Sequence, residues 1–303
     1  KTNDRVWELI EWREQALGKD FKFNFLNKKI KLSKKRDWFN KDISKLWLYN
    51  LNYFHELNSL NSNSRKNLLE DYISKWMKYN PPFTKISWDP YTISLRIVNW
   101  IKWHLKGNYL SQKQLISLIL QTKWLVKNIE YRLLANHLFS NGKALIFAGV
   151  FFEDSDADKW FNKGEKIILD QINEQCLKDG GHFERSPMYH ALFLEDIIEL
   201  IQLSKIYPNK FSKQWEKQLK EKSLEMLLWL KNMTHPDGSI TFFNDSTNAI
   251  GPSYRTLEKM IKTLDDENKY KKFKLKGTTL FKESGFGRLK TKRIVCFCDI
   301  GSI

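Results

Sequence analysis

Apolar residues recur at a spacing of three to four positions through most of the chain from residue 65 onward. This period is typical of amphipathic helices that bury one face. It predicts helices over residues 65–79, 91–106, 112–130, 136–150, 155–176, 187–205, 211–233 and 252–265. Taken in pairs, they recur about every 45–50 residues, as in stacked two-helix repeats. The pattern therefore predicts a mainly α fold, a curved array of antiparallel helix hairpins.

The two ends of the chain have different patterns. Apolar spacing predicts a further helix over residues 4–18. Residues 19–45 are mixed and basic, which predicts an irregular segment with one or two short strands, such as 21–26. After residue 276 the composition is rich in β-branched and aromatic residues with turn glycines. Strands are expected there at 277–281, 285–289 and 293–299. The chain ends as this sheet begins, so we expect a longer protein.

Between the basic segment and the regular helices lies Leu46–His55, in which aromatic residues alternate with polar ones. Two interpretations remain open from the sequence. The segment is either a packed entry helix or one wall of a groove.

Charge and aromatic content add a binding preference. The 303 residues include 51 Lys and Arg against 35 Asp and Glu, a net charge of +16, together with 12 Trp, 11 Tyr and 20 Phe. Such a balance favours an anionic partner, although lysines spread over amphipathic helices also make an ordinary solvated surface. Cys176, Cys296 and Cys298 form no metal-spaced set and no disulfide framework. The longest apolar run, 144–152, is too short to span a bilayer.

The first motif with candidate chemistry covers residues 87–100. Asp89 and Pro90 suit the N-cap and first position of a helix, and Arg96 and Asn99 are three apart, on one face. One interpretation makes Arg96 an anion clamp beside aromatic platforms at Trp88 and Tyr91. The other makes Arg96 a structural arginine that bridges helices.

The second motif covers residues 134–145 and starts an apolar helix with Asn136 and His137. Asn136 suits a plain helix N-cap as well as a functional role. His137 suits a core histidine bound to a backbone carbonyl as well as a catalytic group.

The third motif, at 180–190, follows a Gly-Gly turn that interrupts any helix. Ser186 suits an N-cap and Pro187 the first helical position, so Tyr189 and His190 fall in the first turn. With Glu184 and Arg185 just before the helix, several polar groups meet at one helix end.

An asparagine, a tyrosine and histidines occur here without a Ser/His/Asp set, phosphate loop or carboxylate pair. These groups fit the removal of the C5 proton of a uronic acid. The amide of an asparagine can neutralise the carboxylate into which the developing negative charge delocalises. A tyrosine whose pKa is lowered by nearby cations, here Arg185 and the overall positive charge, can act as base at C5 and as acid toward the leaving oxygen.

These three motifs and two later segments resemble those of the heparinase II/III-like polysaccharide lyases. The resemblance rests on WDPYTISLRIVNW at 88–100, NHLFSNGKAL at 136–145, GGHFERSPMYH at 180–190, FNDS at 243–246 and FKESGFGRLK at 281–290. It implies an incomplete (α/α) toroid followed by an antiparallel β-sandwich, here truncated after its first strands. The implied domains are an N-terminal arm at 1–45, the toroid at 46–270 and the start of the sandwich at 277–303.

The resemblance implies that Asn136 neutralises the carboxylate and that Tyr189 is the catalytic acid and base. His137 and His190 are further catalytic candidates. The expected substrate-binding residues are Trp88, Tyr91, Arg96, Asn99, Glu184, Arg185, Asn244 and Asp245. For Asp245, an Asx-turn is the alternative. The family also uses a histidine of the sandwich domain, for which no matching segment exists in these 303 residues.

The expected partner is therefore an acidic, uronic-acid-containing polysaccharide such as heparan sulfate, cleaved by β-elimination. A noncatalytic helical module that binds anionic glycans is the alternative. Nucleic acid is not expected, because no recognised nucleic-acid motif is present, and no cofactor, metal or transmembrane segment is expected. A periplasmic or secreted location is expected, with the cytoplasm left open, and the sequence does not indicate an oligomeric state.

Overall fold

The computed structural model describes residues 6–133, 135–265, 273, 275 and 277–301. Within these ranges the chain forms two compact units. The first unit contains Trp7 and Glu11–Ile168, and the second contains Glu8–Ile10 and the chain from Leu169 onward. The domain boundaries expected from the sequence stay a prediction.

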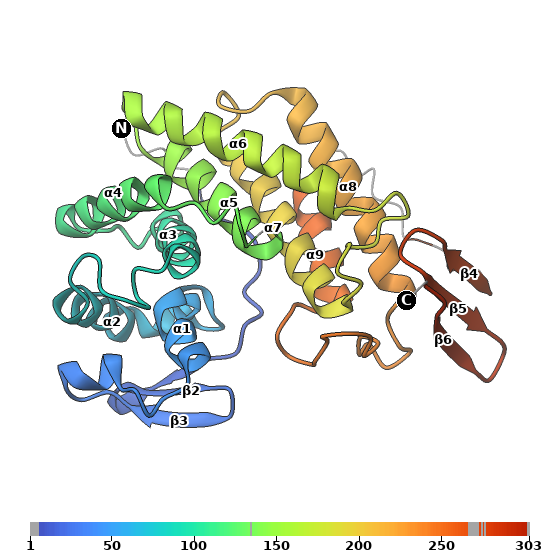
Figure 1. The fold of residues 1–303 in the computed structure, drawn as a ribbon, viewed down its shortest axis with the longest axis horizontal. Helices are drawn as coiled ribbons and strands as arrows, with labels where there is room; N and C mark the ends of the chain where they lie inside the picture. The colour runs from blue at the N-terminus through green and yellow to red at the C-terminus, as the bar shows by residue number, and fades with distance from the viewer. Residues whose placement is uncertain (1–5, 134, 266–272, 274, 276, 302–303) are drawn as a thin grey trace. The chain divides into compact units, whose positions relative to one another are not determined.

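The described chain is mainly helical, as predicted (Figure 1). The first unit holds α1 Lys45–Tyr53, α2 Lys66–Tyr79, α3 Pro90–Leu105, α4 Gln112–Lys127, α5 Ala135–Phe151 and most of α6 Ser155–Gln175. The second holds α7 Pro187–Ile206, α8 Lys213–Asn232 and α9 Tyr254–Leu264. All eight helices predicted from the apolar spacing are confirmed. The aromatic segment that begins at Leu46 forms α1, so the interpretation as a packed helix is correct.

The prediction of a helix over residues 4–18 is wrong for the residues that the structure describes. Residues 6–16 are irregular, and Leu17 already belongs to a strand. Their backbone groups bond to distant segments: Trp7 N–H donates to the Leu105 carbonyl, and the Arg13 carbonyl accepts from Leu60 N–H. Trp7, Leu9 and Leu17 are buried although residues 6–16 form no helix, so helical spacing of apolar residues did not indicate a helix here.

Two small antiparallel sheets confirm the strands predicted near both ends. In the first unit β1 Leu17–Gly18, β2 Lys22–Phe25 and β3 Lys28–Lys31 pair in chain order. In the second unit β4 Thr278–Phe281, β5 Phe286–Lys290 and β6 Val295–Asp299 do the same. Three short strands cannot bury both of their faces, so the first sheet lays Phe23 against Tyr72 of α2, with ring centroids 5.1 Å apart.

Glycines let α5 and α6 pack closely as an antiparallel hairpin. A Cβ on Gly149 would lie 2.6 Å from the backbone nitrogen of Phe161, and one on Gly164 would lie 2.6 Å from the Gly142 carbonyl oxygen. Since residue 149 faces the start of α6 and residue 142 faces a later turn, the helices run in opposite directions. This contact fixes α5, the helix that carries Asn136 and His137.

The charged centre of the first unit is Arg96 of α3, which is fully buried. Its guanidinium donates to Gln121 Oε1 of α4 at 2.7 Å, to the Ser87 carbonyl at 2.8 Å and to the Asn52 carbonyl of α1 at 3.2 Å. Its carbon Cζ also lies 4.1 Å from the ring centroid of Trp76 in α2. Burial lowers the pKa of Arg96 to about 9, so the group stays charged at neutral pH. One side chain thus joins four helices.

We expect Arg96→Met to lower the free energy of unfolding by about 3 kcal/mol, because three buried acceptors lose their donor. Denaturant unfolding measures this loss. Lys113→Met, at an exposed position of α4, is the control and should change stability by less than about 0.5 kcal/mol. Equal stability of the Arg96 variant and the wild type would contradict the structural role.

Candidate active site

In the first unit, a cluster of ionisable and aromatic side chains lies where α3 and α5 begin. His137 Nδ1 lies 3.1 Å from Glu130 Oε1, and the His137 ring stacks on Tyr91 with centroids 4.2 Å apart. Asn141 Nδ2 donates to Glu130 Oε2 and to Ser94 Oγ. His137 is therefore held between an aromatic face and a carboxylate. It is partly exposed, so the alternative of a core histidine bound to a carbonyl does not describe it.

Asn136 lies beside this cluster, inside the first turn of α5 and not at the helix cap. The residue is half-buried, and within the part of the chain that the structure describes its amide has no hydrogen-bond partner. The preceding Ala135 has a φ of +45°, a backbone region that alanine rarely adopts. The helix end thus presents an amide that internal contacts leave unused.

A second carboxylate, Asp89, occupies the N-cap position of α3 without capping it. No side-chain hydrogen bond to the helix is formed; instead Asp89 Oδ2 accepts from the Tyr49 hydroxyl at 2.7 Å. Burial, Asp89 and Glu130 together raise the pKa of Tyr49. The ring of Tyr53 packs against Tyr49, His55 and Tyr91. The predicted N-cap position is correct, but the Asp89 carboxylate accepts a hydrogen bond from the Tyr49 hydroxyl instead of from the helix N–H groups.

Three predicted substrate-binding residues of the first unit lie in its core. Arg96 is fully buried, and Asn99 donates to the Tyr53 carbonyl and accepts from Asn58. Trp88 is 4% exposed. These placements favour the alternative that the sequence left open for Arg96, a structural arginine. Of the four predicted binding residues in this unit, Tyr91 is the one that joins the cluster around His137.

In the second unit, the start of α7 is held against the loop at 243–246. Ser186 Oγ accepts from Tyr189 N–H at 3.2 Å as the helix N-cap, and it donates to the Asp245 carbonyl at 3.0 Å. Ser246 Oγ lies 3.0 Å from Ser186 Oγ. The Asn244 amide donates to the Arg185 carbonyl at 2.9 Å. This docking brings Asp245 and Glu184 near the half-buried Tyr189.

The electrostatic surroundings of Tyr189 differ from the expectation. Burial, Asp245 and Glu184 raise the pKa of the Tyr189 phenol, whereas the sequence argument expected nearby cations to lower it. The guanidinium of Arg185 points elsewhere: a Cβ on Gly301 would lie 2.7 Å from its Nη1. Burial and Asp245 also raise the pKa of Glu184. Within the second unit, therefore, the surroundings of Tyr189 favour its phenol form over the tyrosinate.

His190 lies in the core behind Tyr189. The residue is fully buried, its Nε2 donates to the Met226 carbonyl at 2.9 Å, and its ring stacks on Trp229 with centroids 4.4 Å apart. Burial lowers the pKa of His190 to about 3. The neutral imidazole ties α7 to α8, and this placement favours a structural role over catalysis.

The Gly-Gly turn is shaped by close contacts to two other elements. Gly180 has a φ of +84°, and a Cβ there would lie 2.6 Å from the Glu225 carbonyl oxygen; one on Gly181 would lie 2.7 Å from Ser284 Cβ. Asp179 accepts from both the backbone N–H and the hydroxyl of Ser284. Only glycines fit between α8 and the turn after β4, so this contact positions the segment that leads to Tyr189.

The sequence argument missed Glu130, Asn141 and Tyr49. Asn141 could have been found, since it lies four residues after His137 and therefore on the same helix face. The helix predicted over residues 112–130 included Glu130, but α4 ends at Lys127 and Glu130 lies in the segment that leads to α5. Across the described ranges, no group of three His, Cys, Asp or Glu side chains has the spacing of a metal site. No helix within those ranges is long and apolar enough to cross a membrane.

Comparison with solved structures identifies the class of fold. A crystal structure of heparinase III matches with a TM-score of 0.65 at 20% identity, over 82% of this chain and 44% of that one. A crystal structure of the heparan sulfate lyase HepC of Pedobacter heparinus matches with a TM-score of 0.56 at 17% identity. The match covers 89% of this chain and 47% of that one. The predicted class, a mainly helical (α/α) toroid with short antiparallel strands after the helices, is confirmed.

Sequence comparison then identifies the family. The family described as "Heparinase II/III N-terminus" matches residues 11–271, and the chain belongs to it. A heparin-sulfate lyase of Bacteroides stercoris is 29% identical over 135 residues, which are 43% of this chain and 20% of that protein. A heparin-sulfate lyase of Bacteroides thetaiotaomicron is 30% identical over 122 residues, which are 37% of this chain and 17% of that protein. The chain spans less than half the length of the matched structures.

Replacing Ser186 tests how the start of α7 is held. We expect Ser186→Ala to cost about 2 kcal/mol of unfolding free energy, because a helix cap and the buried bond to the 243–246 loop are both lost. Ser212→Ala is the matched control: Ser212 caps α8 by accepting from Trp215 N–H at an exposed position, and its loss should cost about 1 kcal/mol. Denaturant unfolding measures both. Equal losses would show that the loop contact adds nothing.

Proposed function

We propose that the protein to which this chain belongs is a polysaccharide lyase that cleaves a uronic-acid-containing, heparan-sulfate-like polysaccharide by β-elimination. Membership of the heparinase II/III N-terminus family over residues 11–271 is the observation that carries the proposal. The matched relatives named as heparin-sulfate lyases support the substrate class. Such polymers occur outside the cytoplasm, so the proposal includes a periplasmic or secreted location.

In the proposed mechanism, the Asn136 amide hydrogen-bonds the uronate carboxylate. The C5–H bond breaks and its proton passes to a base while negative charge develops on that carboxylate. A preorganised amide that no internal contact occupies can stabilise this charge without rearrangement. The half-buried, unpartnered amide of Asn136 within the described chain supports this assignment.

The proposal gives Tyr189 both proton transfers. Its tyrosinate takes the C5 proton, and the resulting phenol donates that proton to the glycosidic oxygen as the C4–O bond breaks, leaving a 4,5-unsaturated uronate. The phenol hydroxyl has no hydrogen-bond partner in the described part of the chain, so it is available to substrate. Tyr91 and the His137–Glu130 pair are proposed to contact the sugar near Asn136. Glu184, Arg185, Asn244 and Asp245 are proposed to shape the site around Tyr189.

Two substitutions test the mechanism. We expect Tyr189→Phe to lower the rate of unsaturated-product formation by about a thousandfold and Asn136→Ala by about a hundredfold or more. The ultraviolet absorbance of the 4,5-unsaturated uronate on heparan sulfate gives the rate, with the full-length protein and this chain measured side by side. Tyr109→Phe, an exposed tyrosine of the first unit, is the control. Normal turnover by Tyr189→Phe would refute the mechanism, and glycan binding without product would favour the noncatalytic binding module.

The raised pKa of Tyr189 predicts the pH profile. A base works in its deprotonated form, so below the pKa the value of kcat/KM should rise about tenfold per pH unit, with no plateau below the ordinary tyrosine pKa of about 10. Asp245→Asn removes a carboxylate that raises this pKa, so the rise should shift to lower pH. Asp237→Asn, at an exposed turn of the same unit, should leave the profile in place. A flat profile between pH 7 and 9 would exclude Tyr189 as the base.

A further inference from the structure

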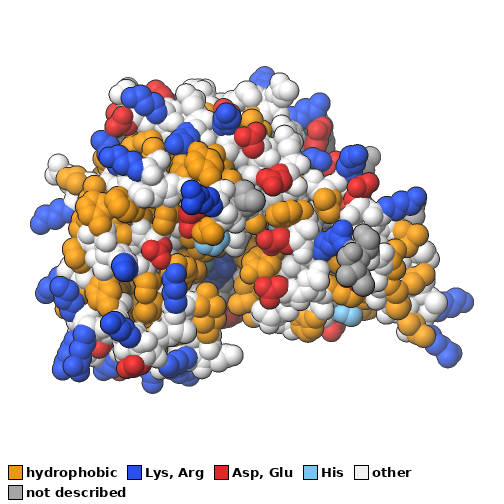
Figure 2. All heavy atoms as spheres, in the orientation of Figure 1, with side chains coloured by type: hydrophobic (Ala, Val, Ile, Leu, Met, Phe, Trp, Pro, Cys, Tyr) orange, Lys and Arg blue, Asp and Glu red, His pale blue; other side chains and the backbone are white. Residues whose placement is uncertain are grey.

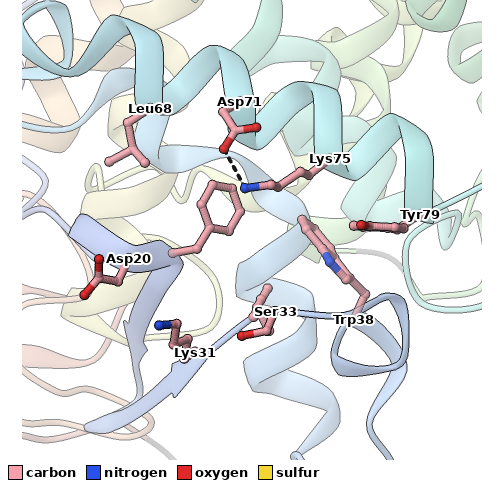
Figure 3. A pocket seen from close by; sticks show the side chains of 10 residues that line it. Asp20, Lys31, Ser33, Trp38, Leu68, Asp71, Lys75 and Tyr79 are labelled. Atoms are coloured by element: carbon pink, nitrogen blue, oxygen red, sulfur yellow. Dashed lines mark hydrogen bonds and ion pairs between the residues drawn. The ribbon is translucent and has the colours of Figure 1, made fainter.

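A cavity of about 400 Å³ lies between the first sheet and α2, and none of its lining residues belongs to the proposed catalytic site. Figure 3 shows side chains from α2 on one side and from the N-terminal segment on the other. The residues around it include Asp20, Lys31, Ser33, Asp71, Lys75 and Tyr79.

The aromatic walls of this cavity are held in place from behind. Trp38 stacks on Tyr72 with an interplanar angle of 27°, and its centroid lies 6.2 Å from that of Tyr79. Trp38 is 2% exposed, whereas Tyr79 is half-buried and borders the open space. Flat aromatic side chains beside hydroxyl and carboxylate groups, here Ser33 and Asp20, match the apolar faces and hydroxyls of a sugar.

A cation is fixed at the same place. Lys75 Nζ lies 3.8 Å from the ring centroid of Phe21 and 2.6 Å from Asp71 Oδ2 (Figure 3). Lys31 of β3 lines the cavity from the opposite side. An anionic sugar in the cavity would therefore meet ammonium groups from two elements.

The strands beside the cavity carry positive charge that the fold does not neutralise. Lys22 and Lys31 are directly opposed in the sheet, and Lys29 faces Asn24. All three lysines are exposed, and within the described residues none has an ion-pair partner. Directly opposed like charges destabilise a sheet. Residues 19–45 contain ten Lys and Arg against three Asp, and Lys and Arg gather at the lower left of Figure 2, where Figure 1 places β2 and β3.

The backbone at the cavity rim is strained. Asp20 and Phe21 have consecutive φ values of +59° and +58°. Aspartate tolerates this region, but a bulky residue such as Phe rarely adopts it. In this conformation the ring of Phe21 lies under the Lys75 ammonium, and strained backbone of this kind is often found in ligand-binding segments.

We propose that this cavity and the lysines of β2 and β3 form a second binding site for an acidic polysaccharide, separate from the catalytic residues. The proposal rests on the substrate class of the proposed function. Nucleic acid is the less favourable occupant, because Asp20 and Asp71 can accept hydrogen bonds from sugar hydroxyls, and a deoxyribose-phosphate backbone has no hydroxyl donors. A site that holds the polymer raises the effective concentration of neighbouring units at the catalytic residues. It therefore lowers KM for long chains and not for short ones.

Binding is tested in a Tyr189→Phe background, so that the probe, immobilised heparan sulfate, is not consumed. We expect the triple variant Lys22→Gln, Lys29→Gln, Lys31→Gln to bind heparan sulfate about tenfold more weakly. Each exposed charge pair that is lost weakens binding by up to about fivefold. The slope of log Kd against log salt concentration should fall by about one per lysine engaged. Lys113→Gln, on α4, is the control and should bind as the background does.

A second variant separates stacking from charge. Tyr79→Leu keeps an apolar side chain and should weaken heparan sulfate binding severalfold without changing the salt slope. Denaturant unfolding checks that it is folded. Single-stranded DNA is the competitor: displacement of bound heparan sulfate by DNA at equal charge concentration would overturn the choice of ligand.

The outcomes distinguish this inference from the proposed function. With Tyr189 intact, the triple variant should raise KM for the polymer and leave kcat/KM for a tetrasaccharide unchanged. Unchanged binding by the triple variant would overturn the second site even if elimination occurs. Site-dependent binding without elimination by the wild type would uphold the second site and reject the lyase mechanism. No binding to heparan sulfate by the wild type would reject the second site.

Discussion

The first unit depends on the hydrogen bonds that the buried guanidinium of Arg96 donates. A charge in a dry interior is tolerated only when hydrogen bonds replace its lost hydration, and here acceptors come from α1, α4 and the segment before α3. Those acceptors must therefore keep their places whenever the unit is folded. Tyr91, at the start of the same helix α3, is placed by this network, and through its stacking so is the ring of His137.

In the second unit, neutral buried groups and not a buried charge hold the start of α7 in place. His190 is buried beside Trp229 as an uncharged imidazole, and Ser186 joins a helix cap to a loop backbone. Neutral hydrogen bonds avoid the desolvation cost of a buried charge. The carboxylates of Glu184 and Asp245 stay nearer the surface, where they raise the pKa of Tyr189. A rigid neutral core thus supports a proposed catalytic phenol whose charge state depends on groups around it.

Sequence reasoning succeeded where structure is local. All eight helices with regular apolar spacing were predicted, because a helix buries residues three and four apart. The prediction of a helix over residues 4–18 is wrong for the described residues, because backbone groups of residues 6–16 bond to distant segments such as Leu105. Arg185 and the overall positive charge were expected to lower the pKa of Tyr189. The pKa is raised instead, because Asp245 and Glu184 act on the half-buried phenol, whereas the Arg185 guanidinium lies against Gly301.

The amino-acid sequence by itself determined the helical class, the short strands and the family motifs around Asn136 and Tyr189, because each depends on residues close together in the chain. Only the tertiary structure decided which polar groups are buried and paired. It placed Arg96, Asn99 and His190 in the core and brought Glu130 to His137. It also brought Lys31 and Lys75 to one cavity. The burial and long-range pairing of these polar groups depend on how distant segments pack, and the spacing of nearby residues does not predict that packing.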